Sequence, residues 1–404
     1  MSRLVALRDV VEKSTGSHNP TVKPDDTFAY VDVSAIDNEQ KVIAGARQLL
    51  GAEAPSRARK LLRSHDVLVS TVRPNLNAVA VVPPELDGQV GSTGFCVLRA
   101  VPDKALPAFL FYFVRSRRFV DSLSGLVAGA LYPAVTDSQV LAQELPLLSL
   151  SEQQRIVDLL SRAEGIVRLR RQAQQKAAEL IPAIFVDMFG DPATNSKGLA
   201  VVTLGDVLAS ADYGSSSKAS DTDAGLPMIR MGNVGYSGNV DLSDLKYVDL
   251  APDEVVRFGL KDGDILFNRT NSKELVGKTG LWIGDREAIL ASYFIRLRVS
   301  EQRARPFFVW AFMNMPHMKR VLFETARGAI GQANINSREL RAFRIPLPGL
   351  DEQARFESRC RDVIALRSQQ RHAMVKAEAA FQALLARAFS AASQPAFDCE
   401  EATT

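Results

Sequence analysis

Two long stretches of the sequence carry apolar residues at alternating steps of three and four, the spacing of one face of an α-helix. The first stretch is 151–189, and the second, 351–389, repeats its pattern, so that Ile156 corresponds to Phe356 and Ala177 to Ala377. A core helix of a compact domain is usually much shorter. We therefore expect two long helices that pair through these seam positions: Ile156, Leu160, Ala163, Val167, Ala177, Ile181, Ile184, Phe356, Val363, Met374, Ala377, Phe381 and Leu384.

The ends of the first helix are also marked in the sequence. Ser151 is the expected N-cap, and Glu152 places a negative charge in the first turn, where the helix dipole favours it. Pro182 lacks an N–H group and is expected to kink or end the helix near Leu180.

The rest of the chain repeats as well, with a period of about 200 residues that contains one domain and one long helix. Each helix follows a similar lead-in, ELPLLSLSEQ in the first copy and FRIPLPGLDEQ in the second. In each copy a turn with Asp66 or Asp264 leads into a β-rich run, a polar loop and a further strand. A helix opened by proline follows, over 107–123 or 306–322, and then a Gly-rich loop, a short helix and a strand.

These patterns predict a mixed α/β (α+β) fold with a pseudo-two-fold tandem repeat. Two globular domains would be separated by two long antiparallel coiled-coil helices, each spanning on the order of 55 Å. The expected segments are a first domain, the first spacer helix, a second domain, the second spacer helix and a disordered tail without pattern, at 1–150, 151–190, 191–348, 349–390 and 391–404.

Composition and charge limit the kinds of protein that this chain can be. The net charge of the 404-residue chain is only +3, so a nucleic-acid partner has to be argued from local basic patches. The three cysteines (Cys96, Cys360 and Cys399) are far apart, which argues against a disulfide framework or a zinc site. Without a run of 18 apolar residues or a signal-peptide pattern, we expect a cytoplasmic protein that binds no membrane.

The order of these parts resembles the specificity subunit of type I restriction-modification systems, over nearly the whole chain. The segments that carry the resemblance are LPLLSLSEQQRIVDLL, AIFVDMFGDP, GDILFNRTN and GAIGQANINSRELRAFRIPLPGLDEQ. The first copy departs from the pattern, because Leu131, Tyr132 and Pro133 stand where the second copy has Gln332, Ala333 and Asn334.

The resemblance implies that each domain is a target recognition domain reading one half of an interrupted double-stranded DNA site. The paired helices would set the gap and dock two modification (methyltransferase) subunits, and restriction (translocase and nuclease) subunits could join them. The chain itself would carry no catalytic centre, metal or cofactor. S-adenosylmethionine, and ATP with Mg²⁺, would be bound by the partner subunits. Such a protein serves DNA methylation and phage defence.

DNA recognition needs cations for phosphates and planar amide or guanidinium groups for base edges. The polar loops of both domains supply them. The candidates in the first domain are Arg57, Arg59, Lys60, Arg63, Thr71, Arg73, Asn75 and Asn77. Those in the second domain are Arg269, Asn271, Ser272, Lys273, Lys278, Arg327, Gln332, Asn334 and Asn336. Loop Asn and Ser residues also make turns and helix caps, and the run before Arg338 has this second interpretation.

The sequence argues against a nucleotide-binding enzyme and against a self-contained methyltransferase or nuclease. SKELVGKT (272–279) approaches a phosphate-binding loop, but the residues after Thr279 read as a strand, so no helix N-terminus could hold the phosphate. An Asn-Pro-Pro-Tyr type motif and an acidic nuclease cluster are both missing from the sequence. The alternative that stays open is a coiled-coil adaptor with two protein-interaction domains and no DNA binding.

Overall fold

The computed structural model describes residues 3–13, 15–222, 225–326 and 333–390. The chain divides into two compact units: unit 1 is formed by residues 1–170 and 373–404, and unit 2 by residues 171–372. The tail predicted at 391–404, the candidate residues Arg327 and Gln332, and Cys399 lie outside the described residues. The domain limits given above stay a prediction, because each unit also takes in part of both long helices.

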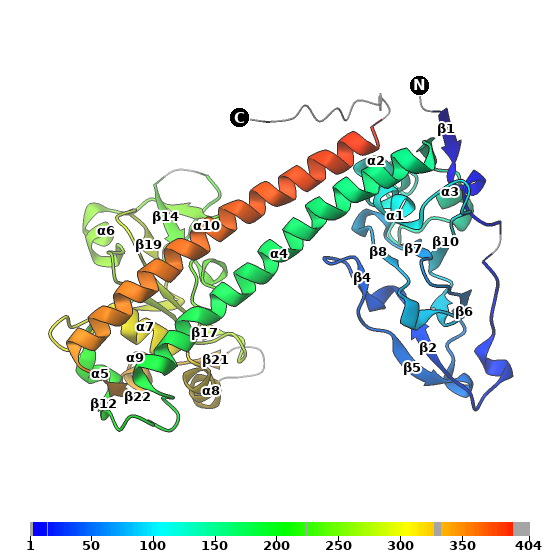
Figure 1. Ribbon diagram of the computed structural model, residues 1–404. Helices are drawn as coiled ribbons and strands as arrows, with labels where there is room; N and C mark the ends of the chain where they lie inside the picture. The colour runs from blue at the N-terminus through cyan, green and yellow to red at the C-terminus, as the bar shows by residue number, and fades with distance from the viewer. Residues whose placement is uncertain (1–2, 14, 223–224, 327–332, 391–404) are drawn as a thin grey trace, which may run out of the picture. The chain divides into compact units, whose positions relative to one another are not determined.

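Unit 1 is built mainly from short antiparallel strands that are followed by helices (Figure 1). Its sheets have the strand orders β5-β2-β9-β6, β10-β7-β8, β1-β11 and β3-β4 in the described part of the chain. The strands are β1 (Arg3–Ala6), β2 (Thr27–Val31), β3 (Ile36–Asp37), β4 (Val42–Ile43), β5 (Arg47–Leu50), β6 (Ala58–Leu61), β7 (Val67–Ser70), β8 (Val79–Val81), β9 (Val90–Ser92), β10 (Phe95–Leu98) and β11 (Glu144–Leu147). The helices are α1 (Pro107–Arg115), α2 (Arg117–Gly125), α3 (Asp137–Leu141) and the first half of α4 (Leu150–Phe189).

Unit 2 repeats this plan with a longer central sheet, β13-β20-β16-β18, beside the sheets β15-β14-β19, β12-β22 and β17-β21, counted over its described residues. Its strands are β12 (Ala200–Thr203), β13 (Leu208–Tyr213), β14 (Leu226–Ile229), β15 (Lys246–Val248), β16 (Ile265–Asn268), β17 (Thr270–Asn271), β18 (Thr279–Leu281), β19 (Ile289–Leu290), β20 (Phe294–Val299), β21 (Ala333–Asn334) and β22 (Arg344–Leu347). The helices are α5 (Leu204–Val207), α6 (Pro252–Phe258), α7 (Pro306–Asn314), α8 (Pro316–Thr325) and α9 (Ser337–Arg341). Unit 2 also contains the second half of α4 and the first part of α10 (Leu350–Ala388), whose residues from 373 onward belong to unit 1.

The strand pairing confirms the predicted repeat. In both units the first strand pairs antiparallel with the last one, β1 with β11 and β12 with β22. Both place a central strand between two antiparallel neighbours, β7 between β10 and β8, and β16 between β20 and β18. Both also contain one parallel pair, β2 with β9 and β14 with β19. The same pairing scheme therefore recurs in two different sequences.

The long helices pack antiparallel within each unit, as predicted. In unit 2 the end of α4 meets the start of α10: the rings of Phe185 and Phe189 lie 5.7 and 5.2 Å from the ring of Phe356. In unit 1 the start of α4 and the end of α10 share one core, which includes Leu160 and Phe381.

The pairing seam differs in part from the one predicted. Of the predicted seam residues, Ile156, Leu160, Ala177, Ile181, Phe356, Val363, Met374 and Phe381 are buried. Ala163, Val167, Ile184, Ala377 and Leu384 are only partly buried. Phe185, Phe189 and Leu385, absent from the predicted set, are buried in their place. These three side chains turn into the cores of the two units, because each long helix also packs on the α/β layer beside it.

Two predictions about the first helix are wrong. The helix does not end near Leu180: it runs from Leu150 through Pro182 to Phe189, within one residue of the spacer predicted at 151–190. Burial of Ile181, Phe185 and Phe189 on both sides of the proline outweighs the missing backbone hydrogen bond. The N-cap is Ser149 rather than Ser151, because Ser149 and Glu152 exchange side-chain and backbone hydrogen bonds in a capping box.

The helices predicted over 107–123 and 306–322 are each two helices. Ser116 is extended and its hydroxyl caps α2 by accepting a hydrogen bond from Phe119 N. Met315 is extended because it precedes Pro316, which disfavours the helical conformation of the residue before it. The break lets α7 pack with all of its residues from Phe307 to Met313 buried.

Candidate nucleic-acid interface

In both units, a polar loop that carries at least half of the candidate residues connects two strands of the central sheet. In unit 1 this is the β7–β8 loop, residues 71–78, and in unit 2 it is the segment between β16 and β18, residues 269–278. We call them recognition loop 1 and recognition loop 2. Each loop is held in place by hydrogen bonds and ion pairs of the residues around it.

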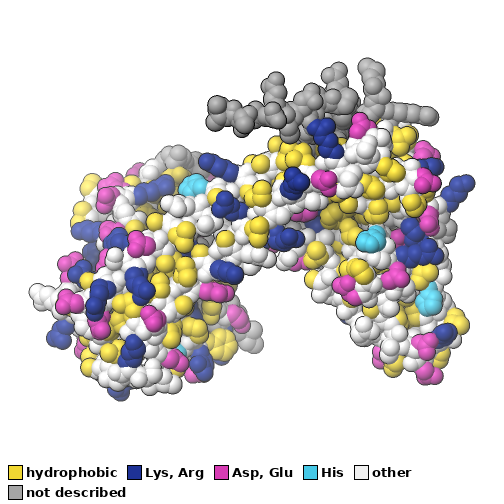
Figure 2. Space-filling model, viewed as in Figure 1, with side chains coloured by type: hydrophobic (Ala, Val, Ile, Leu, Met, Phe, Trp, Pro, Cys, Tyr) yellow, Lys and Arg dark blue, Asp and Glu magenta, His cyan; other side chains and the backbone are white. Residues whose placement is uncertain are grey.

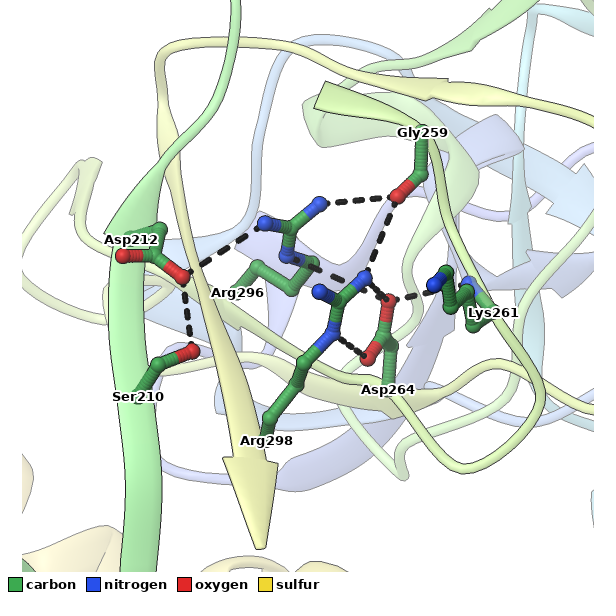
Figure 3. A network of polar contacts seen from close by, with 7 residues as sticks. All are labelled: Ser210, Asp212, Gly259, Lys261, Asp264, Arg296 and Arg298. Carbon is green, nitrogen blue, oxygen red and sulfur yellow. Dashed lines mark hydrogen bonds and ion pairs between the residues drawn. The ribbon is translucent and has the colours of Figure 1, made fainter. Parts of the chain in front are cut away.

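The turn before recognition loop 2 is fixed by a buried carboxylate (Figure 3). Asp264, 2% exposed, accepts hydrogen bonds from Arg298 Nε at 2.8 Å and from the Lys261 backbone N–H at 2.9 Å. Arg296 donates to the Gly259 carbonyl at 2.7 Å, and its Nε lies 3.9 Å from Asp264. The hydrogen bond to Asp264 raises the pKa of Arg298.

Unit 1 contains the same device. Asp66, 1% exposed, accepts from Arg99 Nε and Nη2 at 2.8 and 2.7 Å and from the Arg63 backbone N–H at 2.8 Å. Arg99 Nη2 also donates to the Leu61 carbonyl at 3.3 Å, the position that Gly259 holds in unit 2. The predicted turn with Asp is therefore a structural clamp that engages Arg99, Arg296 and Arg298 within the fold.

The loops are also held alike at their starts. Thr71 and Arg269 occupy equivalent positions: their amides donate to Gly94 O and Tyr293 O, both at 2.9 Å. Their carbonyls accept from Val135 N at 2.8 Å and Ile335 N at 3.0 Å, just before α3 and α9. Each recognition loop is thus tied by its backbone to the segment that leads into the short helix.

The Arg269 side chain is held against an exposed tyrosine. Its guanidinium carbon lies 4.8 Å from the centre of the Tyr213 ring, and Nη1 donates to Ser292 O at 3.4 Å. Arg269 Nε is buried without a hydrogen-bond partner. Stacking restricts the side chain and orients the remaining N–H groups, which suits a guanidinium that reads a base edge or binds a phosphate.

The other candidates in recognition loop 2 have different surroundings. Asn271 Nδ2 donates to Asn268 Oδ1 at 2.9 Å, and its Oδ1 accepts from the Ser272 backbone N–H, so this amide shapes the turn. Lys273 is exposed, with Nζ 4.6 Å from the centre of the Phe323 ring. Lys278 is buried, donates to Met231 O at 2.7 Å and has its pKa lowered by burial. Lys278 therefore supports the loop from inside.

Asn334 and Asn336 are also structural in this chain. Asn334 Oδ1 accepts a hydrogen bond from the Thr270 hydroxyl at 3.3 Å, across the β17–β21 pair. Asn336 caps α9 by accepting from the amides of Arg338 and Glu339, both at 2.9 Å. The helix-cap interpretation of this run is confirmed.

Recognition loop 1 presents a smaller set of free polar side chains. Arg73 and Asn75 are exposed, and Arg73 takes a left-handed backbone conformation with φ +50°. Thr71 is buried and its hydroxyl donates to Gly94 O at 3.0 Å. Asn77, also left-handed, donates from Nδ2 to Val114 O at 2.8 Å, which ties the loop to the end of α1. Arg73 and Asn75 are thus the exposed polar side chains of this loop.

The four basic residues before recognition loop 1 also include both exposed side chains and side chains that are bonded within the fold. Arg57 and Arg63 are exposed, whereas Arg59 is partly buried and donates to Ala58 O at 2.7 Å. Lys60 forms a 2.6 Å ion pair with Asp137, the first residue of α3. Lys60 thus joins β6 to α3. Figure 2 shows lysines and arginines interspersed with acidic side chains on the visible face, in keeping with local rather than bulk positive charge.

Sequence reasoning missed two lysines that support the recognition loops. Lys41 Nζ donates to Asn77 O at 2.6 Å, and Lys319 Nζ donates to Gly277 O at 3.0 Å. Asn77 and Gly277 are both left-handed and both stand just before the second strand. Burial lowers the pKa of Lys41 to about 8 and that of Lys319 to about 7. The lysines come from different elements, so no repeated sequence motif could have revealed them.

Two further features bear on function. The segment after Thr279 is strand β18, which confirms that SKELVGKT does not form a phosphate-binding loop. In the described part of the chain, no helix combines the length and apolar character needed to cross a membrane.

Comparison with known proteins identifies the family. Residues 196–369 match the type I restriction modification DNA specificity domain. A chain in a structure of the assembly and conformational transition of a type I restriction-modification system is 31% identical, with a TM-score of 0.63, over 96% of this chain and 97% of that one. This chain belongs to the type I specificity subunits.

Named relatives agree with this assignment. The type I restriction enzyme EcoKI specificity subunit of Escherichia coli strain K12 is 25% identical over 73% of this chain and 67% of its own length. The putative type I restriction enzyme MjaX specificity subunit of Methanocaldococcus jannaschii is 30% identical over 37% of this chain and 36% of its own. The matched region spans about a third of the length of that archaeal relative.

As a specificity subunit, the chain recognises DNA for a type I restriction-modification complex and assembles with other subunits. It performs no catalysis itself, which confirms the prediction that it is not an enzyme. The adaptor alternative is not favoured. The roles predicted for individual loop residues stay predictions, and the structure narrows them by separating exposed side chains from those already bonded within the fold.

Proposed function

We propose that each unit reads one half of an interrupted double-stranded DNA site through its recognition loop. The single observation that supports this most strongly is the shared framework: one Asp–Arg clamp and one pair of backbone tethers hold a loop of different sequence in each unit. A repeated scaffold with unlike loops suits two half-sites of unlike sequence.

Within each loop, the exposed or stacked side chains are the proposed DNA contacts. These are Arg73 and Asn75 in unit 1, and Arg269 and Lys273 in unit 2. Arg57 and Arg63 would bind phosphates beside recognition loop 1. Affinity would then fall steeply with salt, because each phosphate contact releases counterions.

The paired helices α4 and α10 would set the gap between the half-sites and dock two modification subunits, with restriction subunits joining the same complex. S-adenosylmethionine for methylation, and ATP with Mg²⁺ for translocation and cleavage, would be bound by those partners.

The test is selection of bound duplexes from a random-sequence pool, using the chain co-expressed with its neighbouring methyltransferase subunit at moderate salt. We expect a motif of two short blocks separated by a fixed unspecified gap. Binding without an enriched sequence, or enrichment of one uninterrupted block, would overturn the two-half-site proposal.

A further inference from the structure

Unit 2 contains a pocket of about 280 Å³ that is separate from recognition loop 2. Three arginines line it: Arg286, which follows β18, and Arg367 and Arg371 on α10. Arg367 and Arg371 are four residues apart, so they lie on the same face of the helix. The remaining wall includes Leu242, Trp282, Ile283 and Ile364, and it is largely apolar.

The pocket is short of negative charge. No ion pair or side-chain hydrogen bond joins these three arginines to other residues in the described ranges. The carboxylate of Asp241 accepts a hydrogen bond from the Ser243 backbone N–H at 3.0 Å, and the hydrogen bonds from Ser243, more than the charge of Arg371, lower its pKa. Burial and the neighbouring Arg371 lower the pKa of Arg367. An incoming anion would relieve this repulsion.

A second observation points to a missing acceptor. Trp282 lines the pocket, is 3% exposed, and its buried Nε1–H group has no hydrogen-bond partner. A buried N–H without a partner destabilises the fold, because it has lost its hydrogen bond to water and gained none in return. Trp310, which also lines the pocket, satisfies its own Nε1 on Gly238 O at 3.2 Å. The contrast singles out Trp282 as a donor that a ligand oxygen could use.

We propose that this pocket receives an acidic side chain, Asp or Glu, of a partner subunit, together with an apolar residue beside it. The volume lies below the range of about 300–1,000 Å³ usual for small-molecule sites. Arginine and tryptophan next to apolar walls are characteristic of the centre of protein–protein interfaces. DNA contacts need cations spaced along a strand, whereas these three arginines line a single pocket. The proposal rests on the assembly role given above and adds the surface that carries it.

The first experiment uses the chain co-expressed with its methyltransferase subunit. In the double variant Arg367→Glu, Arg371→Glu, we expect the affinity between the subunits to fall at least 10-fold, because two charges then repel the acidic residue. Arg355→Glu is the matched control: it is exposed on the same helix and does not line the pocket. It should leave the affinity nearly unchanged. The milder double variant Arg367→Gln, Arg371→Gln should weaken assembly less, and unfolding temperatures verify that all variants fold.

The second experiment uses the chain's own fluorescence. Its two tryptophans, Trp282 and Trp310, both line the pocket, so fluorescence excited selectively at tryptophan, and not at the seven tyrosines, reports on this place. Overlapping peptides that cover the methyltransferase subunit and lack tryptophan are titrated in turn. We expect one acidic peptide to change the fluorescence of the wild-type chain and not of the Arg367→Glu, Arg371→Glu variant.

The outcomes separate this proposal from the proposed function. Normal assembly of the folded charge-reversed variant overturns the pocket proposal, and normal assembly with lost DNA affinity identifies a phosphate site instead. A two-block DNA motif from the wild-type complex tests recognition independently. If that motif is absent while the charge-reversed variant still loses its partner, recognition by two half-sites fails and the pocket proposal stands.

Discussion

The buried amide of Gln353 joins the first turn of α10 to Arg305, the residue before α7: its Oε1 accepts a hydrogen bond from the Arg305 backbone N–H at 2.8 Å. Gln153 does the same in unit 1, accepting from Leu106 N at 2.9 Å and donating to Lys104 O and Leu148 O. In both units one glutamine therefore fastens a long helix to the helix opened by proline.

Replacing this glutamine should destabilise its unit. Gln153→Ala leaves the Leu106 N–H without a partner in the core, at a cost of about 1–3 kcal/mol in the free energy of unfolding. The neighbouring Gln154 is exposed, and its side chain donates a hydrogen bond to Asp158 on the same helix and not to another element among the described residues, so Gln154→Ala is the control. Urea denaturation followed by circular dichroism measures both. Equal losses for the two variants would contradict the anchoring role.

The Asp–Arg clamp should be required for stability as well as for loop placement. Asp264→Ala leaves Arg298 and Arg296 without their shared carboxylate, and removing one partner of a buried pair costs about 3–5 kcal/mol. We expect the lower end, because the Arg298 side chain is 31% exposed and water can solvate it. Thermal unfolding of this variant is compared with Asp285→Ala, an exposed acid in the same unit. A stable Asp264→Ala protein would show that the clamp is dispensable.

Lys319 should give unit 2 a stability that rises with pH above neutrality. Its folded pKa, about 7, lies below its ordinary value of 10.5, so between these pH values the unfolded chain binds more protons than the folded one. The penalty for burying the charge is complete below pH 7 and declines as the pH rises towards 10.5. Wild-type stability relative to Lys319→Met should therefore increase from pH 7 to 10, measured by urea unfolding at each pH. The exposed Lys261→Met variant should show no such trend.

Gly277 should be intolerant of a side chain. Its φ is +80°, and an added Cβ would lie 2.8 Å from Leu322 Cδ1 in the core. A left-handed conformation costs a residue with a Cβ about 1–2 kcal/mol, and the contact adds to this. Gly277→Ala should lower the unfolding temperature, whereas Gly232→Ala, where the added Cβ meets open space, should not. Similar unfolding temperatures for the two variants would disprove the conformational requirement.

The two recognition loops should affect different halves of the DNA motif. Arg73→Ala and Arg269→Ala should each weaken binding roughly 10-fold or more, the effect of losing a base or phosphate contact. Sequence selection with the co-expressed complex should then show relaxed preference in one block for Arg73→Ala and in the other for Arg269→Ala. Arg303→Ala, an exposed arginine outside both loops, serves as the control. Changes confined to the same block in both variants would contradict the assignment of one half-site to each unit.

The sequence by itself determined the two long helices and the duplicated order of elements. Helical periodicity and the Glu-Gln pairs that end at Gln153 and Gln353 are local patterns of a few residues, so they can be recognised from spacing alone. The Asp-led turns and the strand after Thr279 could be predicted for the same reason. The family resemblance followed from this order, and it supplied the expected DNA-binding role.

Tertiary structure decided what each polar side chain is free to do. Lys60 forms an ion pair with Asp137. Lys278 donates a hydrogen bond to the carbonyl of Met231, and Asn77 donates one to the carbonyl of Val114. All three partners are distant in sequence. Packing also explains why α4 continues past Pro182, because the aromatic residues beyond the proline are buried in unit 2. The type and spacing of each residue can be read from the sequence. Whether its charge or amide still faces solvent depends on neighbours that only folding brings together.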